Sequence, residues 1–410
     1  MEIFKKLFGY STAQSSNDIN NNDKEDHEQQ VTNSMSQSAH DNNRYDKKTS
    51  ANNTSLFMNK NIHIAILAIC EILFFISCTR NSNVTTITQF PKVEELNHEI
   101  IPTPNVLYTP TGLLLLDSAV IVQDLKSDTI FQVFKFPSFA YAGGFVKRGG
   151  GPDEEIFVDP FMQRLANNQF MFKNLTGVKI LKYNPLIDTI STVKDIKFDT
   201  SLTDMYHVFM LNNHIIGVRA DVATNKEFVS YDPQTQKTDD FGDDYPIVSR
   251  NIKIAGEDKI QLFAKANTVK PDGTAFASVY DKFPILRIYS NTGELKKDIR
   301  LDNNQRFPYA LIKQSPTLDE VNEMMQNYRM IKSTNHFIYA LYIGQKNKSL
   351  SPGLNDFSNI IHVWDWDGNP IMELKLDRKI FTFDVSPNDE FLICSSFGEI
   401  NALYKYELPL

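Results

Sequence analysis

The chain has 410 residues, with 42 lysines and arginines against 50 aspartates and glutamates, so its formal net charge is −8. Nucleic-acid binding needs a basic stripe, and because no lysine or arginine run exceeds two residues, nucleic acid is excluded as a partner. The three cysteines, Cys70, Cys78 and Cys394, cannot form a disulfide framework or a CxxC zinc site.

The first predicted segment, residues 1–57, is a disordered low-complexity tail. Residues 11–55 contain only seven apolar residues and are rich in asparagine, serine, glutamine, aspartate and lysine. Such a stretch cannot bury enough surface to offset the entropy of the chain. A second methionine, Met58, follows the tail. One interpretation is therefore that Met58, and not Met1, is the true start of the protein.

Residues 58–78 are predicted to be a lipoprotein signal peptide or a membrane anchor. Lys60 supplies a positive charge, an apolar run follows as far as Ile76, and Ser77 places a small residue before Cys78. Charge, apolar run and small-residue site in this order are typical of a signal peptide, and the run is short for a transmembrane helix. The ending resembles a bacterial lipobox, which makes Cys78 the candidate lipidation site.

Two alternatives for this segment stay open. One is an uncleaved anchor with a cytoplasmic tail, and the other is a buried core helix. Both the signal peptide and the anchor place the rest of the chain outside the cytoplasmic membrane. A short linker, residues 79–98, is expected to lead into the folded region, residues 99–410.

The folded region contains a repeated unit, in which a strand ends in an aromatic residue and a turn signal. Copies lie at residues 120–124, 180–185, 228–233, 286–293, 361–368 and 402–406. Six copies at about 50 residues each match the size of a four-stranded propeller blade. Strand alternation directs one side of each strand into a core between sheets. The sequence therefore predicts an all-β fold, a six-bladed β-propeller, with a β-sandwich as the alternative.

Two further elements complete the expected architecture. Thr317 and Glu320 have the spacing of a capping box, which predicts a helical insertion near residues 315–330. Propellers usually close by completing one blade from both ends of the domain, which removes exposed sheet edges. Residues 107–116 and 402–408 are the strand-like segments expected to pair in this closure.

A glycine-rich motif at residues 145–155, FVKRGGGPDEE, resembles the signature that follows the first blade in TolB-like six-bladed β-propeller lipoproteins of Bacteroidetes. The segments at 270–277 and 364–370 are similar to that family in style. The resemblance covers about residues 80–410. It implies a propeller fold and a place in the cell envelope, and it implies no reaction.

The same glycine run supplies the candidate ligand-binding residues. Consecutive glycines let backbone amides converge on an anion, and the preceding lysine and arginine would add positive charge. The candidates are Lys147, Arg148, Gly149, Gly150, Gly151 and Glu154. The alternative is a tight turn between blades, because the spacing matches neither common nucleotide-binding loop.

No catalytic residue, metal site or cofactor is predicted. The histidines, His207 among them, show neither the HExxH pattern nor paired metal spacing, and no GxSxG motif occurs. The expected function is an exported, lipid-anchored binding or scaffold module for a peptide, a glycan or an envelope protein. The alternative is a periplasmic hydrolase or lyase with its site in the propeller channel. The expected location is the outer membrane, facing the periplasm, with Cys78 holding the membrane through its lipid.

Overall fold

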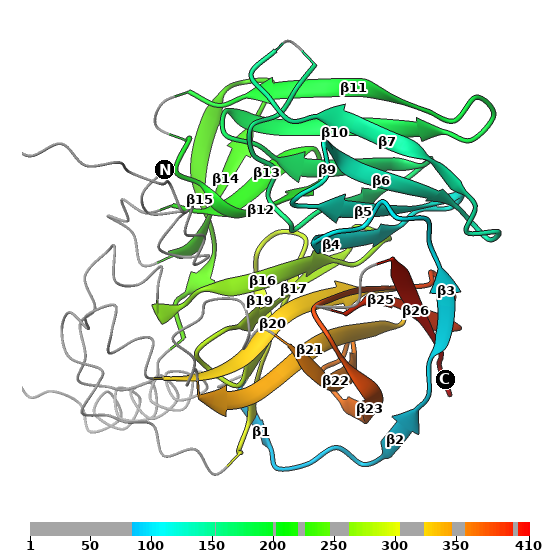
Figure 1. Ribbon diagram of the computed structural model, residues 1–410. Helices are drawn as coiled ribbons and strands as arrows, with labels where there is room; N and C mark the ends of the chain where they lie inside the picture. Colours follow the sequence, from blue (N-terminus) through cyan, green and yellow to red (C-terminus); the bar gives the residue numbers. More distant parts are fainter. Residues whose placement is uncertain are drawn as a thin grey trace, which may run out of the picture. The chain divides into compact units, whose positions relative to one another are not determined.

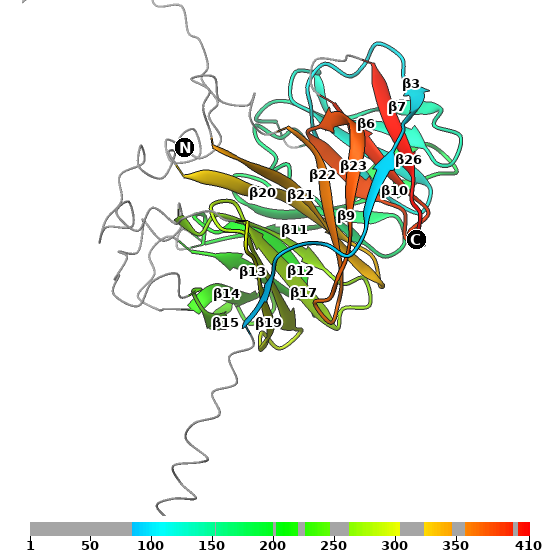
Figure 2. The same ribbon diagram turned by 90° about the horizontal axis from the view of Figure 1, so that it is seen from below.

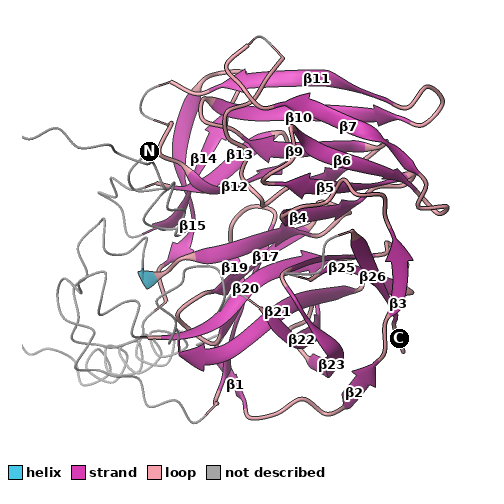
Figure 3. Cartoon of the chain, viewed as in Figure 1, coloured by secondary structure: helices cyan, strands magenta, loops and turns pink. Residues whose placement is uncertain are grey.

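The computed structural model describes residues 84–151, 153–199, 202–219, 226–246, 262–303, 324–346, 357–396 and 401–410. Within these residues the chain is built from strands and the turns that join them, apart from one short helical stretch at Leu262 (Figure 3). The strands form six sheets, which succeed one another along the chain (Figure 1). We call these sheets blades 1 to 6.

The first three blades each contain four antiparallel strands. Blade 1 consists of β4 (Pro110–Leu115), β5 (Ala119–Asp124), β6 (Thr129–Lys135) and β7 (Tyr141–Lys147). Blade 2 consists of β8 (Gln163–Leu165), β9 (Gln169–Lys173), β10 (Gly177–Asn184) and β11 (Thr189–Lys197). Blade 3 consists of β12 (Tyr206–Leu211), β13 (His214–Val218), β14 (Lys226–Asp232) and β15 (Lys237–Asp244).

The last three blades also receive strands from the N-terminal side. Blade 4 consists of β16 (Lys265–Val269), β17 (Ala275–Tyr280), β18 (Ile285–Ser290) and β19 (Leu295–Leu301), with β1 (Val84–Ile87) added. Blade 5 consists of β20 (Met325–Ser333), β21 (Phe337–Lys346), β22 (Ser358–Asp365) and β23 (Pro370–Ile380), with β2 (Val93–Leu96) added. Blade 6 consists of β24 (Thr382–Val385), β25 (Phe391–Ser395) and β26 (Ala402–Glu407), completed by β3 (Glu99–Pro102).

The first strand of each blade is the innermost one, and these six strands surround a central channel. Contacts run from β4 to β24, β20, β16 and β12 in turn, and from β4 to β8 on the other side. The predicted six-bladed propeller is therefore confirmed. The alternative of a β-sandwich is excluded, because a sandwich has two facing sheets and this fold has six.

Buried apolar layers between neighbouring blades form the core. Each of the six interfaces has its own cluster of buried side chains. The aromatic residues that end the third strands lie in these layers, namely Tyr183, Tyr231, Tyr289 and Trp364. Burying one large apolar side chain contributes roughly 1.5–3 kcal/mol. This burial explains why an aromatic residue marks the repeat.

The repeat copies in blades 2 to 6 are confirmed as third strands, which are β10, β14, β18, β22 and β26. The earliest copy, residues 120–124, is wrong by one strand, because it is β5, the second strand of blade 1. The third strand of that blade is β6, whose Phe134 is buried. The turn after β6 begins with Phe136 and Pro137 and lacks the aspartate or asparagine signal of the other copies.

A strap formed by residues 84–102 runs along the outside of blades 4, 5 and 6 (Figure 2). In it, β1 pairs in parallel with β19, β2 pairs in parallel with β23, and β3 pairs antiparallel with β26. Between β1 and β2, the Phe90 ring packs 4.3 Å from the His362 ring and 5.2 Å from the Trp364 ring. The predicted linker, residues 79–98, is therefore wrong from residue 84 onward, because these residues pair with strand edges and protect them.

Closure joins both ends of the propeller in blade 6, as expected, but with a different partner. The strand β26 pairs with Glu99–Pro102, whereas residues 110–115 form β4, the innermost strand of blade 1. Blade 6 has only three strands from the C-terminal side, so its outer edge is open until β3 covers it. His98 fixes this junction through a 2.7 Å contact between its Nδ1 and Oδ2 of Asp377 on β23.

The predicted helical insertion near residues 315–330 is wrong for its second half. Residues 325–330 belong to β20, which pairs with β21. Tyr328, Met330 and Ile331 of this strand are buried between blades, and that packing overrides the helical pattern. Residues 304–323 lie outside the described residues, as do the tail at 1–57 and the segment at 58–78 with Cys78. In the described ranges, no helix has the length and apolar character needed to cross a membrane.

Candidate functional site

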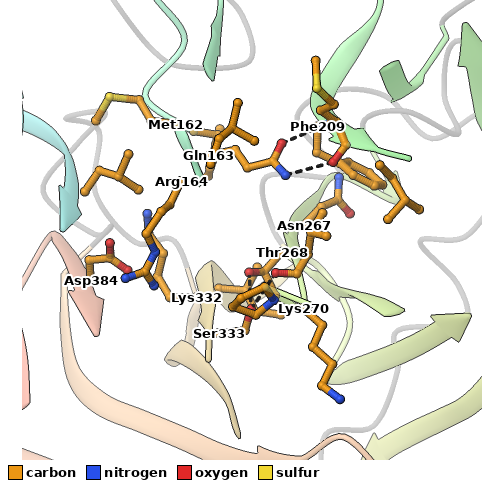
Figure 4. A pocket seen from close by; sticks show the side chains of 18 of the residues that line it. Met162, Gln163, Arg164, Phe209, Asn267, Thr268, Lys270, Lys332, Ser333 and Asp384 are labelled. Carbon is orange, nitrogen blue, oxygen red and sulfur yellow. Dashed lines mark hydrogen bonds between the residues drawn. The ribbon is translucent and has the colours of Figure 1, made fainter. Parts of the chain in front are cut away.

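The central channel contains a cavity of about 480 Å³, which is within the range of about 300–1,000 Å³ typical of small-molecule sites. Residues of all six innermost strands line it (Figure 4). The turns that follow these strands also contribute, among them Asp117, Ala166, Asn213, Lys270 and Asn335. The cavity therefore extends to the face of the propeller that carries these turns.

The lining has two layers, which follow from the alternation of side chains along a strand. The penultimate residue of each innermost strand reaches the cavity: Leu114, Arg164, Met210, Thr268, Lys332 and Asp384. Residues two positions earlier face the same side, and in four blades these are Met162, Val208, Ala266 and Met330, all buried lining residues. We call these four the apolar layer. We call Arg164, Lys332 and Asp384 the charged layer, which lies nearer the turns.

Arg164 of β8 extends toward Lys332 and Asp384 on one side of the cavity (Figure 4). Its Nη1 atom is buried and has no hydrogen-bond partner among the described residues. The neighbouring Gln163 fixes β8 in place, since its amide donates to the Met210 carbonyl at 2.9 Å and accepts from the Met210 amide at 2.7 Å. The strand that carries Arg164 is therefore held rigidly, while the guanidinium itself keeps unused donor capacity.

Lys332 and Asp384 complete the charged layer. The Lys332 ammonium donates to the Leu113 carbonyl at 3.1 Å. Burial lowers the pKa of Lys332, and Asp384 opposes this shift while Arg164 adds to it. The Asp384 carboxylate accepts from the backbone amides of Leu115 at 2.7 Å and Val385 at 2.9 Å. The layer thus combines two cationic side chains with one carboxylate whose oxygens are both engaged by the backbone.

Polar side chains of β16 and β20 in the cavity wall are bonded to one another. The hydroxyls of Thr268 and Ser333 lie 2.8 Å apart, and Ser333 also donates to the Val269 carbonyl at 3.1 Å. The Asn267 amide donates to the His207 carbonyl at 2.9 Å. These bonds tie blade 4 to blades 3 and 5. They fix the shape of the wall and use the hydroxyls structurally.

His207 lies at the inner end of the cavity, where its ring packs edge to face on Phe161 with 6.0 Å between centroids. Burial, together with the positive charges of Lys265 and Arg329, lowers the pKa of His207 to about 3. The imidazole is therefore neutral at physiological pH. Among the residues that the structure describes, no group of three or more histidine, cysteine, aspartate or glutamate side chains is placed to hold a metal ion.

The glycine-rich loop lies between blades 1 and 2, and none of its predicted ligand-binding residues lines the cavity. Arg148 donates through Nε to the Ser127 carbonyl at 3.0 Å and through Nη2 to the Asp124 carbonyl. Gly151 donates its amide to Oε2 of Glu154 at 3.0 Å. These contacts lie within the loop and the adjoining hairpin of blade 1.

The residue that anchors this loop is Glu155, which the sequence interpretation did not include among the candidates. Its buried carboxylate accepts from the Lys179 ammonium at 2.5 Å and from the Asn174 amide at 3.0 Å, both in blade 2. Its amide donates to the Lys147 carbonyl at 3.0 Å. The geometry is that of the tight turn between blades. Ligand binding by Lys147, Arg148, Gly149–Gly151 and Glu154 stays a prediction.

A second ionisable cluster is buried between blades 3 and 4. The Glu227 carboxylate accepts from the Lys265 ammonium, the Arg287 guanidinium and the hydroxyls of Tyr280 and Tyr289. Arg287 also donates to Oδ2 of Asp298, at 2.8 Å from Nη2 and 2.9 Å from Nε. The side chains of Glu227 and Lys265 are both 0% exposed. Since each charge has its opposite within the cluster, we assign it to holding the two blades together.

Arg164, Lys332 and Asp384 were not predicted from the sequence, although a signal for them exists. The aromatic residue of each repeat marks the third strand, and counting back two strands gives the innermost one. A charged residue just before the end of that strand then faces the channel. Finding it requires the strand order of the blade, which the repeat signal alone does not contain.

Comparisons with known proteins agree with this architecture. The family described as "TolB-like 6-blade propeller-like" matches residues 91–388. A member of the DUF4221 family from Bacteroides vulgatus is 11% identical, covers 76% of this chain and 97% of its own, and has a TM-score of 0.51. A protein from Bacteroides fragilis whose name describes it as exported is 12% identical, covers 80% of this chain and 100% of its own, and has a TM-score of 0.50. At such identities the likeness shows the fold alone. No curated protein matches the sequence.

Proposed function

This chain belongs to the TolB-like family of six-bladed propellers, and we propose that it is an exported, lipid-anchored binding module that takes its ligand into the central channel. The ligand enters from the face that carries the turns after the innermost strands. The ligand is a chemical group that a partner molecule in the cell envelope presents. Since one fold serves many functions, the site and not the family supports this proposal.

The observation that carries the proposal is the charged layer. Arg164 has a buried nitrogen without a hydrogen-bond partner in the described part of the chain, inside a cavity of about 480 Å³. An unsatisfied buried polar atom costs about 1–3 kcal/mol. Such a cost is typical of functional positions, where a ligand supplies the missing partner. The side chains of Gln163, Asn267, Thr268 and Ser333 in the wall are bonded within the protein, so these parts of the cavity keep their shape without a ligand.

Binding is favoured over catalysis by how the lining side chains are used. The lining hydroxyls of Thr268 and Ser333 bond to each other and to a backbone carbonyl, which leaves neither next to a base. His207 is neutral and packs against Phe161. In the part of the chain that the structure describes, no lining side chain is therefore placed to favour the alternative, a periplasmic hydrolase or lyase with its site in the channel.

Two observations support the proposed location. The segment at 58–78 has the charge, apolar run and small-residue ending of a lipoprotein signal, with Cys78 as the residue to be acylated. The Bacteroides fragilis protein with a similar fold is named as exported. Stable anchoring takes more than one lipid chain, which matches the multiple acylation of lipoprotein cysteines.

The test is a matched pair of substitutions in the full-length chain. Ala166 lies exposed at the mouth of the cavity and Ala140 lies exposed in the β6–β7 turn of blade 1. Neither replacement removes a side-chain hydrogen bond. Binding to arrays of envelope peptides and glycans should be lost in Ala166→Trp and kept in Ala140→Trp.

Two results would contradict the proposal. Equal binding by both variants would show that the ligand does not enter the channel from this face. Turnover of an array compound by the wild-type chain, lost in Ala166→Trp, would establish the enzymatic alternative.

A further inference from the structure

We propose that the channel recognises a monocarboxylate with an apolar group beside it, the chemistry found at the C-terminal residue of a peptide. This inference rests on the proposed function and specifies its ligand. The carboxylate is placed between Arg164 and Lys332 in the charged layer. The apolar group is placed deeper, in the apolar layer formed by Met162, Val208, Ala266 and Met330.

The charged layer carries a net positive charge. Arg164 and Lys332 bring two positive charges to one level of the channel, and Asp384 brings one negative charge. The Asp384 oxygens already accept hydrogen bonds from two backbone amides. The charged layer therefore has a surplus of one positive charge, which one monoanionic group would balance.

Both cations of the charged layer keep hydrogen-bond donors that the described residues do not use. Lys332 uses one of its three ammonium donors on the Leu113 carbonyl. The Arg164 guanidinium forms no ion pair with any described residue, and one of its nitrogens lacks a partner. Guanidinium groups bind carboxylates with two parallel hydrogen bonds. A carboxylate between the two cations would satisfy both side chains.

The charged layer lies nearer the turns than the apolar layer does. A ligand entering from the turns meets the charged layer before the buried apolar layer. An apolar group beyond the carboxylate would occupy the deeper part and displace water from it, which is favourable. In the last residue of a peptide, the carboxylate and the side chain leave the same carbon atom. The preceding residues would then extend toward the mouth at Ala166 and Asn213.

The same charge count argues against a phosphate group. A dianion would turn the surplus of one positive charge into an excess of one negative charge beside the buried Asp384 carboxylate. Burial of an uncompensated charge is costly. A monoanion is therefore the better match for this site.

The experiment is isothermal titration calorimetry on the full-length chain. The probes are the tripeptide N-acetyl-Ala-Ala-Leu with a free carboxylate, the same peptide as its amide, hexanoate and inorganic phosphate. We expect the free acid to bind at least about tenfold more tightly than the amide, because truncating a buried charged partner usually costs at least that much. Hexanoate tests whether a carboxylate with an apolar chain is sufficient for binding. If hexanoate binds and the tripeptide acid does not, the site is assigned to free organic acids.

The variants on the protein side are Arg164→Gln and Lys332→Gln, each expected to weaken binding of the acid by about tenfold or more. Lys194→Gln, an exposed cation on β11, is the matched control and should bind like the wild type. Thermal unfolding of each variant checks that the propeller is intact. The comparison of acid with amide uses the wild-type chain and does not depend on the variants folding.

The outcomes separate this inference from the proposed function. If the peptide acid and the peptide amide bind with equal affinity, and Ala166→Trp abolishes the binding of both, the inference that a carboxylate is recognised is wrong. The channel would then still be the binding site. Tighter binding of phosphate than of either carboxylate would overturn the charge argument. If neither hexanoate nor the tripeptide acid binds while other array compounds do, the inference is wrong and the binding function stands.

Discussion

Among the described residues, Glu227 is the one carboxylate that joins Lys265 to Arg287 in the buried cluster between blades 3 and 4, and its replacement is the most informative test of the fold. Glu227→Gln keeps the size and planar shape of the side chain. It removes the negative charge and turns one accepting oxygen into a donating amide group. Asp298 would then supply the one negative charge that remains for both Lys265 and Arg287. Asp298 contacts Arg287 but not Lys265.

The expected loss of stability follows from burial. The Glu227 and Lys265 side chains are 0% exposed and Arg287 is 5% exposed, so water cannot replace the missing charge. Removing one partner of a buried ion pair costs about 3–5 kcal/mol. The glutamine oxygen can still accept one hydrogen bond, which favours the lower end of this range. We therefore expect the free energy of unfolding to fall by about 3 kcal/mol.

The assay is urea unfolding of the full-length chain, followed by tryptophan fluorescence and extrapolated linearly to water. Trp364 is buried in the cluster between blades 4 and 5, so its emission reports on the neighbouring interface. Glu294→Gln is the control, since Glu294 pairs with Lys296 at the surface with side chains 67% and 48% exposed. Exposed pairs contribute about 0–1 kcal/mol.

Equal unfolding energies for the two variants would refute the reasoning, because burial would then make no difference. A second check uses the double variant Glu227→Gln with Lys265→Met. Since it removes the cation along with its partner, its loss should be smaller than the sum of the two single losses.

Three further predictions address other parts of the chain. Gly177→Ala should destabilise the propeller by about 1–3 kcal/mol in urea unfolding, because the added Cβ would lie 2.0 Å from the Ile196 carbonyl oxygen. Gly150→Ala is the control and should be neutral, because the atom nearest to its added Cβ would be 3.9 Å away. Burial raises the pKa of Asp159 from 3.8 to about 6, so the folded chain keeps a proton that the unfolded chain loses between these values. Stability should therefore fall as pH rises from 4 to 6, by up to roughly 2–3 kcal/mol, and Asp159→Asn should remove this slope in unfolding experiments at several pH values. Cys78→Ser should move the protein from the membrane fraction to the soluble fraction, and retention in the membrane would favour the uncleaved anchor.

The architecture could be predicted because every blade buries an aromatic residue at the end of its third strand. Tyr183, Tyr231, Tyr289 and Trp364 are followed by turn residues, and together they give the repeat its length. Blade 1 was placed one strand too early because its outer hairpin turns at Pro137 without that signal. The error is local, since it changes the phase of one blade and not the number of blades.

The strap and the channel could not be predicted for a different reason. Glu99–Pro102 is four residues long and partly exposed, and nothing in its own sequence identifies β26 as its partner. The charged layer brings together residues of three blades, and Arg164 and Asp384 are more than 200 residues apart in the sequence. Local patterns specify strands and turns, whereas these features depend on how the blades close into a ring.

The strap has a consequence for the order in which the propeller is made. Residues 84–102 are synthesised before any of the blades, whereas their partners, β19, β23 and β26, belong to the last three blades. Pairing between such distant segments is slow to form. Until β19, β23 and β26 have been made, the strap strands β1, β2 and β3 lack their partners, so an interrupted chain would expose unpaired edges prone to aggregation. Blade 6 is therefore completed only when β3, from the start of the folded region, pairs with β26.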